Sequence, residues 1–312
     1  MNKLLLAALV SGAMAVPAFA ADYTIMAPAS PGGGWDQTAR TMQEAMQAEG
    51  ISGNVQVTNV PGAGGTIGLA QFVNQYTGNP NALIVGGYVM VGAVLTNASP
   101  VSLANVTPIA RLTGESDVIV VPANSELQSL DDLVAMLKAD PGSVSWAGGS
   151  AGGVDHIAAG LIAKAVGVDP TAVNYIAYSG GGEALAAVLG GQVTVGISGA
   201  GEFAAQIEAG DLRALAVTGD EPFNGIPTLQ DGGVDVVVQN WRMVAAAPGL
   251  TDEQKAAINA DIEKLVASAT WTEALATKGW VNTYLAGDAF DAQLTKDIAA
   301  TEAILKDIGL VQ

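Results

Sequence analysis

The sequence contains no cysteine, a single histidine and few basic residues. Without cysteine the chain has no disulfide, no nucleophilic thiol and no attachment point for the lipid of a lipoprotein, so hydrophobic cores must stabilise the fold. One histidine excludes a metal site built on a histidine pair. The 12 lysine and arginine residues stand against 30 aspartate and glutamate residues, for a formal net charge of −18. This balance excludes the basic face that nucleic-acid binding requires.

The same charge balance restricts how an anion could be bound. A strongly negative chain repels an anionic ligand at long range. Any anion must therefore be held by local groups, namely backbone N–H groups, hydroxyls, helix N-termini or individual arginines.

The N-terminus has the pattern of a cleaved secretory signal peptide. A polar start with Lys3 precedes the apolar run 4–10, and Ala18-Phe19-Ala20 is a small-x-small cleavage site. The apolar run is too short to span a bilayer. We therefore expect residues 1–20 to be removed on export. The remaining residues, 21–312, are long enough for two domains with large cores.

Short apolar runs alternate with helix-period segments along the mature chain. We expect strands near residues 23–26, 55–58, 82–85 and 108–112, with helices at 36–48, 66–75 and 89–95 between them. After an apolar run at 117–121, the pattern restarts and continues to residue 239, and the tail is helical. This alternation predicts an α/β fold with two units. Residues 21–116 plus 240–312 form the expected first domain, and residues 117–239 form the second.

Each unit has a first strand followed by a glycine-rich loop and a helix. The loops are residues 30–36 and 61–65 in the first unit and 148–153 and 179–182 in the second. Ligands of parallel sheets bind beyond the carboxyl ends of the strands, so the four loops can converge on one cleft. Glycines there allow a ligand close to the backbone, and helix N-termini favour an anion. The alternative is that these loops are simply turns that bind nothing.

Sequence signatures of catalysis are scarce. No Gly-x-Ser-x-Gly elbow and no P-loop is present, and the dinucleotide fingerprint fails because its third glycine is Gln37 or Ile67. We therefore expect a protein that is not an enzyme. A secreted α/β enzyme remains an alternative that an activity dependent on His156 would support.

Four residues beside the loops have two interpretations each. Asp36 is either a helix-start carboxylate that interacts with its own loop or an acceptor for a ligand hydroxyl. His156 either donates a hydrogen bond to an anion or caps and packs locally. Trp35 directly follows Gly34 and is either a core side chain or the best candidate for a cleft wall. Arg242 either reaches the cleft, as the arginine best placed to do so, or lies outside it.

The ordered motifs resemble one known family. The pattern Ala27-Pro28-x-x-Pro31-Gly32-Gly33-Gly34-x-Asp36, followed by residues 60–65, resembles the solute-binding proteins of tripartite tricarboxylate transporters, also known as Bug-type receptors. Residues 175–183, 189–193 and 240–242 also fit. The resemblance covers essentially the whole mature chain, in order.

The resemblance implies a type II two-domain periplasmic binding protein fold. Each domain would be a mostly parallel sheet flanked by helices, and the ligand would lie between the domains, held largely by backbone N–H groups and water. No cofactor and no metal are implied. Carried over by position, the expected ligand-binding residues are Ser30, Pro31, Gly33, Gly34, Trp35, Asp36, Gly64, Gly87, Tyr88, Gly149, Ser150, Gly152, His156, Tyr178, Gly180 and Gly181. The family often has Ser or Thr where this chain has Trp35 and Ala151, so the far end of the pocket is not defined by the resemblance.

The function implied is that of a periplasmic receptor for a di- or tricarboxylate, either citrate-like or a C4-dicarboxylate. It would deliver this ligand to the membrane permease subunits of a tripartite transporter. We expect the protein to be a monomer and not to bind nucleic acid. A second carboxylate of the ligand would lie near Trp35, Tyr88 or Tyr178. An alternative is a receptor that presents its ligand to a membrane sensor kinase.

Overall fold

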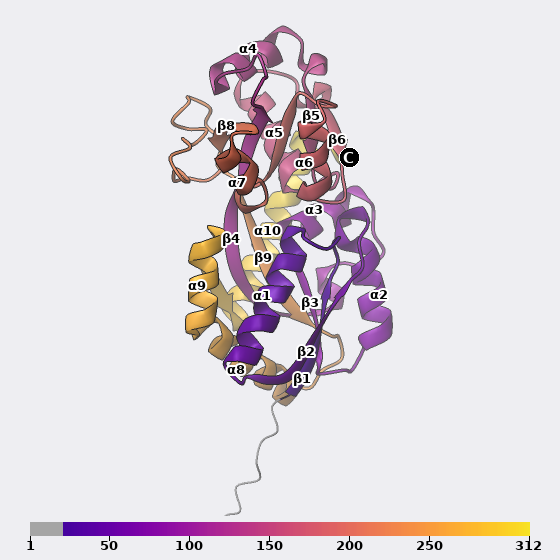
Figure 1. Cartoon of the computed structure of the whole chain (residues 1–312). Helices are drawn as coiled ribbons and strands as arrows, with labels where there is room; N and C mark the ends of the chain where they lie inside the picture. The colour runs from indigo at the N-terminus through magenta and orange to yellow at the C-terminus, as the bar shows by residue number, and fades with distance from the viewer. Residues whose placement is uncertain (1–20) are drawn as a thin grey trace, which may run out of the picture.

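A computed structural model describes residues 21–312 (Figure 1). The signal peptide expected at residues 1–20 lies outside the described residues. Within residues 21–312, no helix combines the length and the apolar character needed to cross a membrane.

The first unit is a parallel three-strand core flanked by helices. Strands β1 (Ala21–Ala27), β2 (Ser52–Asn59) and β3 (Ala82–Gly87) pair in the order β2-β1-β3. They alternate with α1 (Gly34–Ala48), α2 (Thr66–Tyr76) and α3 (Tyr88–Thr96). Helix α1 buries Ala39, Met42 and Met46, whose spacing of three to four residues places them on one face against the sheet.

The second unit repeats this plan. Strands β5 (Ser145–Gly148), β6 (Asn174–Ala177) and β7 (Val195–Gly199) are parallel, with β5 in the middle. Helices α4 (Leu130–Ala139), α5 (Val154–Ala165), α6 (Gly181–Leu189) and α7 (Ala200–Ala209) connect them, and β8 (Leu212–Val217) follows. Short 3-10 turns occupy Ala63–Gly65, Leu103–Asn105, Pro141–Ser143 and Pro170–Ala172.

Two strands cross between the units. Strand β4 (Thr107–Pro122) pairs with β9 (Gln239–Ala246) and β10 (Val281–Ala286) through its first part and with β7 and β8 through its second. All of these pairings are antiparallel, as is that of β3 with β9. The sheet is therefore parallel only within the βαβ parts of each unit. This arises because β4 and β9 traverse the molecule in opposite directions.

The sequence pattern predicted two separate runs, at 108–112 and 117–121, where the structure has the single strand β4. The polar residues between the runs broke the apolar pattern. In the structure Thr113 and Glu115 are buried within the continuous strand. Strand β10 was not predicted either, and it is only partly buried.

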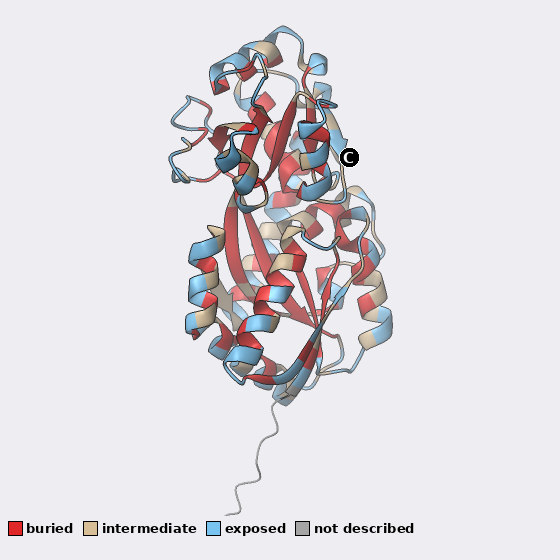
Figure 2. Ribbon diagram, viewed as in Figure 1, coloured by how far each residue is buried: buried red, intermediate tan, exposed pale blue. Residues whose placement is uncertain are grey.

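The remaining helices are α8 (Asp252–Ala267), α9 (Ala269–Lys278) and α10 (Gly287–Asp307). The end of α10 reaches the second unit, where Leu305 and Ile308 pack on Ile157 of α5. Residues 240–312 were all expected in the first domain. Because the end of α10 packs on α5, this helix instead contacts both expected domains. Buried side chains otherwise form separate cores in the two units (Figure 2).

Candidate ligand-binding site

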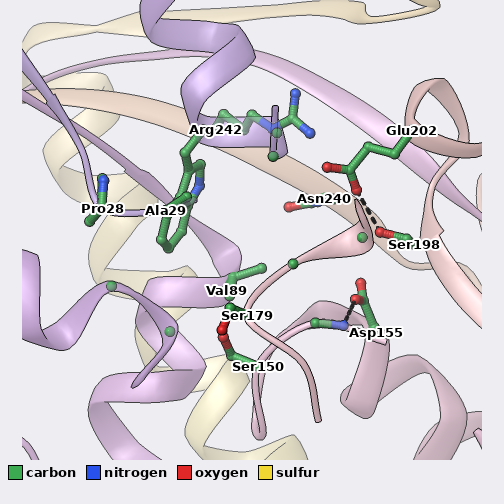
Figure 3. A pocket seen from close by; sticks show the side chains of 18 of the residues that line it. Pro28, Ala29, Val89, Ser150, Asp155, Ser179, Ser198, Glu202, Asn240 and Arg242 are labelled. Carbon is green, nitrogen blue, oxygen red and sulfur yellow. Dashed lines mark hydrogen bonds between the residues drawn. The ribbon is translucent and has the colours of Figure 1, made fainter. Parts of the chain in front are cut away.

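A cleft lies where the glycine-rich loops of both units meet the crossing strands (Figure 3). Its walls come from the loops after β1, β2, β5 and β6, from the ends of β7 and β9, and from α3 and α7. The residues that line it are Pro28, Ala29, Gly33, Gly34, Trp35, Gly62, Gly64, Gly65, Val89, Gly149, Ser150, Asp155, Ser179, Gly180, Gly181, Ser198, Glu202, Asn240 and Arg242.

Half of the sequence-predicted residues lie in this lining and half do not. Those in the lining are Gly33, Gly34, Trp35, Gly64, Gly149, Ser150, Gly180 and Gly181. Tyr178 lies in a second pocket that adjoins the cleft, and Ser150 and Ser179 line both. The predicted residues that line neither pocket are Ser30, Pro31, Asp36, Gly87, Tyr88, Gly152 and His156.

Gly34 begins α1 and lies directly against Arg242 of β9. A Cβ atom at Gly34 would lie 2.3 Å from Nη2 of Arg242, so the position has no room for a side chain. The first N–H groups of a helix have no intrahelical partner and carry partial positive charge. The cleft therefore combines a helix N-terminus with a guanidinium group at this point. Trp35 forms the adjoining wall, with its ring against the backbone of Gly65.

Asp36 holds its own loop. It accepts hydrogen bonds from the N–H of Gly32 (2.8 Å), from Nδ2 of Asn59 (2.9 Å) and from Nε of Arg40 (3.0 Å). Burial acts to raise the pKa of Asp36, but these hydrogen bonds together outweigh it and lower the pKa. The helix-start interpretation of Asp36 is the one that the structure matches.

His156 supports the second loop from behind. Its Nδ1 accepts a hydrogen bond from the N–H of Gly152 (3.2 Å), and its ring stacks on Tyr175 at 4.1 Å between centroids. Burial lowers the pKa of His156 to about 4, so the ring is neutral at pH 7. The structure therefore matches the local interpretation of His156, as a cap and a packing group.

Three other predicted residues outside the lining, Gly87, Tyr88 and Gly152, serve contacts between elements. A Cβ atom at Gly87 would lie 2.2 Å from the carbonyl oxygen of Trp241, so this glycine lets β3 approach β9. Tyr88 stacks on the ring of Trp241 at 6.2 Å. Gly152 has a φ of +74°, and a Cβ atom there would meet Thr96 of α3.

The cleft also has acidic residues on its second-unit side, which were not among the predicted site residues. Asp155 accepts a hydrogen bond from the N–H of Gly149 (2.5 Å), and Oε2 of Glu202 accepts one from the hydroxyl of Ser198 (2.5 Å). Burial, with the charge of Asp155 adding to it, raises the pKa of Glu202 to about 7. Burial also raises the pKa of Asp155 to about 6 and that of Asp117, which faces Asp155, well above its usual range.

One signal for these acids was available in the sequence. Asp36, Asp155 and Glu202 all lie in the first turn of a helix that follows a strand and at least one glycine. Of the three, the sequence pattern placed only Asp36 among the expected ligand-binding residues, and Asp155 and Glu202 were not predicted there.

Arg242 reaches the cleft, but its charge is already matched. It forms a buried ion pair with Glu115 of β4 and lies over the ring of Trp280, 4.9 Å from the centroid. Glu115 also accepts hydrogen bonds from Nε1 of Trp280 (3.0 Å) and Nδ2 of Asn240 (3.4 Å). Burial lowers the pKa of Arg242 to about 9, which leaves it charged at pH 7. Nη1 of Arg242 has no hydrogen-bond partner among the described residues.

The cleft has no preformed metal centre. Within residues 21–312, no group of three or more histidine, aspartate or glutamate side chains is arranged to hold a metal ion.

The fold and the sequence match one family of receptors. Residues 38–310 match the model of the tripartite tricarboxylate transporter family receptor. The chain is 27% identical to protein BugT of Bordetella pertussis over 292 residues, which cover 91% of this chain and 88% of BugT.

Solved structures of similar fold include the periplasmic binding protein BugD. BugD superposes with a TM-score of 0.83 at 21% identity, covering 93% of this chain and 98% of BugD. MatC of Rhodopseudomonas palustris with bound malate gives a TM-score of 0.79 at 20% identity, covering 93% of this chain and all of MatC. Rpa4515 of R. palustris with adipate gives 0.82 at 21% identity, covering 92% and 97%. The chain therefore belongs to the tripartite tricarboxylate transporter receptor family, whose members are periplasmic solute-binding receptors and not enzymes.

Proposed function

We propose that this protein captures a small organic carboxylate in the cleft and delivers it to the membrane permease subunits of a tripartite transporter. The observation that carries the proposal is the meeting of the α1 N-terminus with Arg242 at Gly34. A carboxylate there would accept charge-assisted hydrogen bonds from backbone N–H groups at the start of α1, beside the guanidinium group of Arg242.

Hydrogen-bond donors close to the ligand can bind an anion even though the whole chain is negatively charged. Arg242 is offset by Glu115, and the whole chain carries a formal net charge of −18. Binding then depends on oriented dipoles at short range, where the ligand is desolvated. Glycines at positions 33, 34, 149, 180 and 181 would let the carboxylate approach these dipoles closely.

The proposed ligand class follows from the resemblance and from the relatives. The sequence indicates a citrate-like ligand or a C4-dicarboxylate, and MatC and Rpa4515 were solved with malate and adipate. In our proposal, one carboxylate of such a ligand lies at the α1 N-terminus and the rest extends past Trp35 toward the second unit. The same proposal has three further parts. The protein is periplasmic after removal of the signal peptide, it is a monomer, and its two units hinge near residues 116 and 239.

Thermal unfolding tests the proposal. The purified mature protein is titrated with citrate, malate, succinate, adipate and amino acids of similar size. A ligand at a hundred times its Kd stabilises the folded state by about 2.7 kcal/mol, which raises Tm measurably. The Gly34→Ala variant should lose this shift, because its methyl group would displace the Arg242 guanidinium.

Gly182→Ala is the matched control. Position 182 lies in α6 beside the cleft, and a Cβ atom there meets nothing within 4 Å. This variant should keep the full ligand-induced shift. If no carboxylate shifts Tm of the wild type, or if both variants respond alike, the proposed site is wrong.

A further inference from the structure

Two buried carboxyl groups face each other behind the first glycine-rich loop of the second unit. Asp117 lies on β4 and is fully buried, and Asp155 lies in the first turn of α5 and is 6% exposed. Neither carboxylate oxygen of Asp117 accepts a hydrogen bond from an N–H or hydroxyl group within residues 21–312. The side chain that Asp117 faces is that of Asp155, so a hydrogen bond between the two requires a proton on one of them.

The surroundings of this pair do not neutralise two negative charges. No lysine, arginine or histidine in the described part of the chain forms an ion pair with either aspartate. The titratable groups that act on the pair from the elements packed against it are Tyr88 on α3, Tyr175 on β6 and Glu202 on α7. Glu115, two residues before Asp117 on β4, is itself paired with Arg242. Two ionised carboxylates in contact, away from water, repel strongly, so only one of the two can be ionised.

The proton belongs on Asp117. Asp155 accepts a hydrogen bond from the N–H of Gly149 (2.5 Å) and lies at the N-terminus of α5, and both features favour its ionised form (Figure 3). Asp117 has no such donor, and burial, with the charge of Asp155 adding to it, raises the pKa of Asp117 well above its usual range. A neutral Asp117 can therefore donate a charge-assisted hydrogen bond to the ionised Asp155.

Asp155 in turn holds the loop on the second-unit side of the cleft. Besides the bond from its N–H to Asp155, Gly149 accepts a hydrogen bond at its carbonyl oxygen from the hydroxyl of Tyr175 (2.8 Å). Gly149 and Ser150 line the cleft. Because β4 crosses between the units, the pair connects this loop to a strand that both units share.

We propose that Asp117 and Asp155 share one proton, and that the hydrogen bond it makes between them fixes the loop at residues 148–153 against β4. Asp117 is not in the lining of the cleft, so it is a positioning residue that acts through Asp155. Loss of the proton would place two negative charges in contact and drive the loop away from β4. This inference goes beyond the proposed function and does not depend on which ligand binds.

Carbon NMR of the mature protein, labelled with 13C at its aspartate carboxyl groups, tests for the proton. At pH 7.5 one aspartate signal should keep the chemical shift of a protonated carboxyl group. Asp117→Asn should remove this signal. Asp155→Asn should also remove it, because the introduced amide donates to Asp117 and lets it ionise. Asp131→Asn, at an exposed position of α4, is the matched control and should keep the signal. A wild type without the signal, or a signal that survives in Asp155→Asn, would overturn the shared proton.

The unfolding free energy gives a second readout of the proton. A carboxyl group that binds its proton more tightly in the folded than in the unfolded state makes stability fall as pH rises toward its folded pKa. Urea denaturation between pH 7 and 9 should therefore show a smaller fall in Asp117→Asn than in the control Asp131→Asn. Equal slopes would mean that Asp117 holds no proton in this range.

Amide chemical shifts of residues 149–153 test the positioning. Asp117→Asn keeps a donor toward Asp155, whereas Asp117→Val has a similar size and no donor. We expect wild-type shifts in the asparagine variant. In the valine variant the shifts should be displaced, and the Gly149 N–H should exchange with solvent on the order of tenfold faster. If a folded valine variant keeps the wild-type shifts, or if the asparagine variant loses them, the pair does not position the loop.

Discussion

Glu202 determines much of the charge balance in the cleft. Its carboxylate lies among Ser198, Asp155 and the N–H of Gly34, and its pKa is raised to about 7 mainly by burial. An acid whose pKa is raised on folding binds protons more tightly in the folded than in the unfolded state. The unliganded protein is therefore stabilised by protonation of Glu202, and this stabilisation is lost as pH rises through 7.

The free energy of unfolding should fall between pH 6.5 and 8.0. For a group with a folded pKa of about 7 and an ordinary unfolded value, the expected loss is about 1 kcal/mol over this range. His156 acts in the opposite sense, because its lowered pKa makes it destabilising as pH falls toward and below 6.5. It therefore offsets part of the slope near pH 6.5 and little of it above pH 7. Urea denaturation at several pH values measures the slope.

Asp117 and Asp155 also have raised pKa values, so Glu202→Gln removes one of the titrating groups and should reduce this slope. Glu208→Gln, at an exposed position of the same helix α7, should leave the slope unchanged. Wild-type stability that stays level or increases from pH 6.5 to 8.0 would contradict the assignment.

The strand–loop–helix elements could be predicted from the sequence, but the meeting of Asp155 and Glu202 beside the cleft could not. Apolar runs followed by glycines identified the loops at 30–36, 148–153 and 179–182, because strand ends and helix starts have local signals. Asp155 and Glu202 are far apart in the chain and resemble ordinary helix-start acids. They meet because β5 and β7 are neighbours in the sheet, which places the helices after both strands at one edge.

The crossing strands show a second limit of sequence patterns. Glu115 interrupted the apolar pattern of β4, and nothing near it in sequence indicates its partner Arg242. Strand register brings them together, since Glu115 lies opposite Asn240 on β9. A buried carboxylate at this position is tolerated only because the guanidinium, the Trp280 N–H and the Asn240 amide all point at it.

A double-mutant cycle on Glu115 and Arg242 measures how far the crossing strands depend on this pair. Each single variant, Glu115→Gln or Arg242→Met, leaves one buried charge without its partner, so each should lose about 3–5 kcal/mol of unfolding free energy. The double variant should lose clearly less than the sum. Urea denaturation supplies the values.

Glu302 and Lys306 form an exposed pair on α10 that serves as the control, with an expected loss of less than about 1 kcal/mol. Additive effects at Glu115 and Arg242 would show that the two strands are not coupled through the ion pair.

Glycines allow a close approach of the two units beside the cleft. Helix α3 of the first unit faces the loop before α5, where Gly92 lies against Gly152 and the Thr96 hydroxyl lies 3.3 Å from the carbonyl oxygen of Ala151. A Cβ atom at Gly92 would lie 1.9 Å from the carbonyl oxygen of Gly152. The observed arrangement of the units therefore depends on the absence of one methyl group.

Gly92→Ala should act as a wedge that holds the units apart. Gly92 lies within α3, where alanine is favoured over glycine by about 1 kcal/mol, so the first unit should fold normally. The two units could no longer close to the arrangement described, and ligands gripped by both loops should bind at least about tenfold more weakly. Small-angle scattering should give a larger radius of gyration that ligand no longer reduces. Gly182→Ala, with open space around its Cβ, should scatter and bind like the wild type. Wild-type affinity in Gly92→Ala would mean that the ligand is bound without closure of the two units around it.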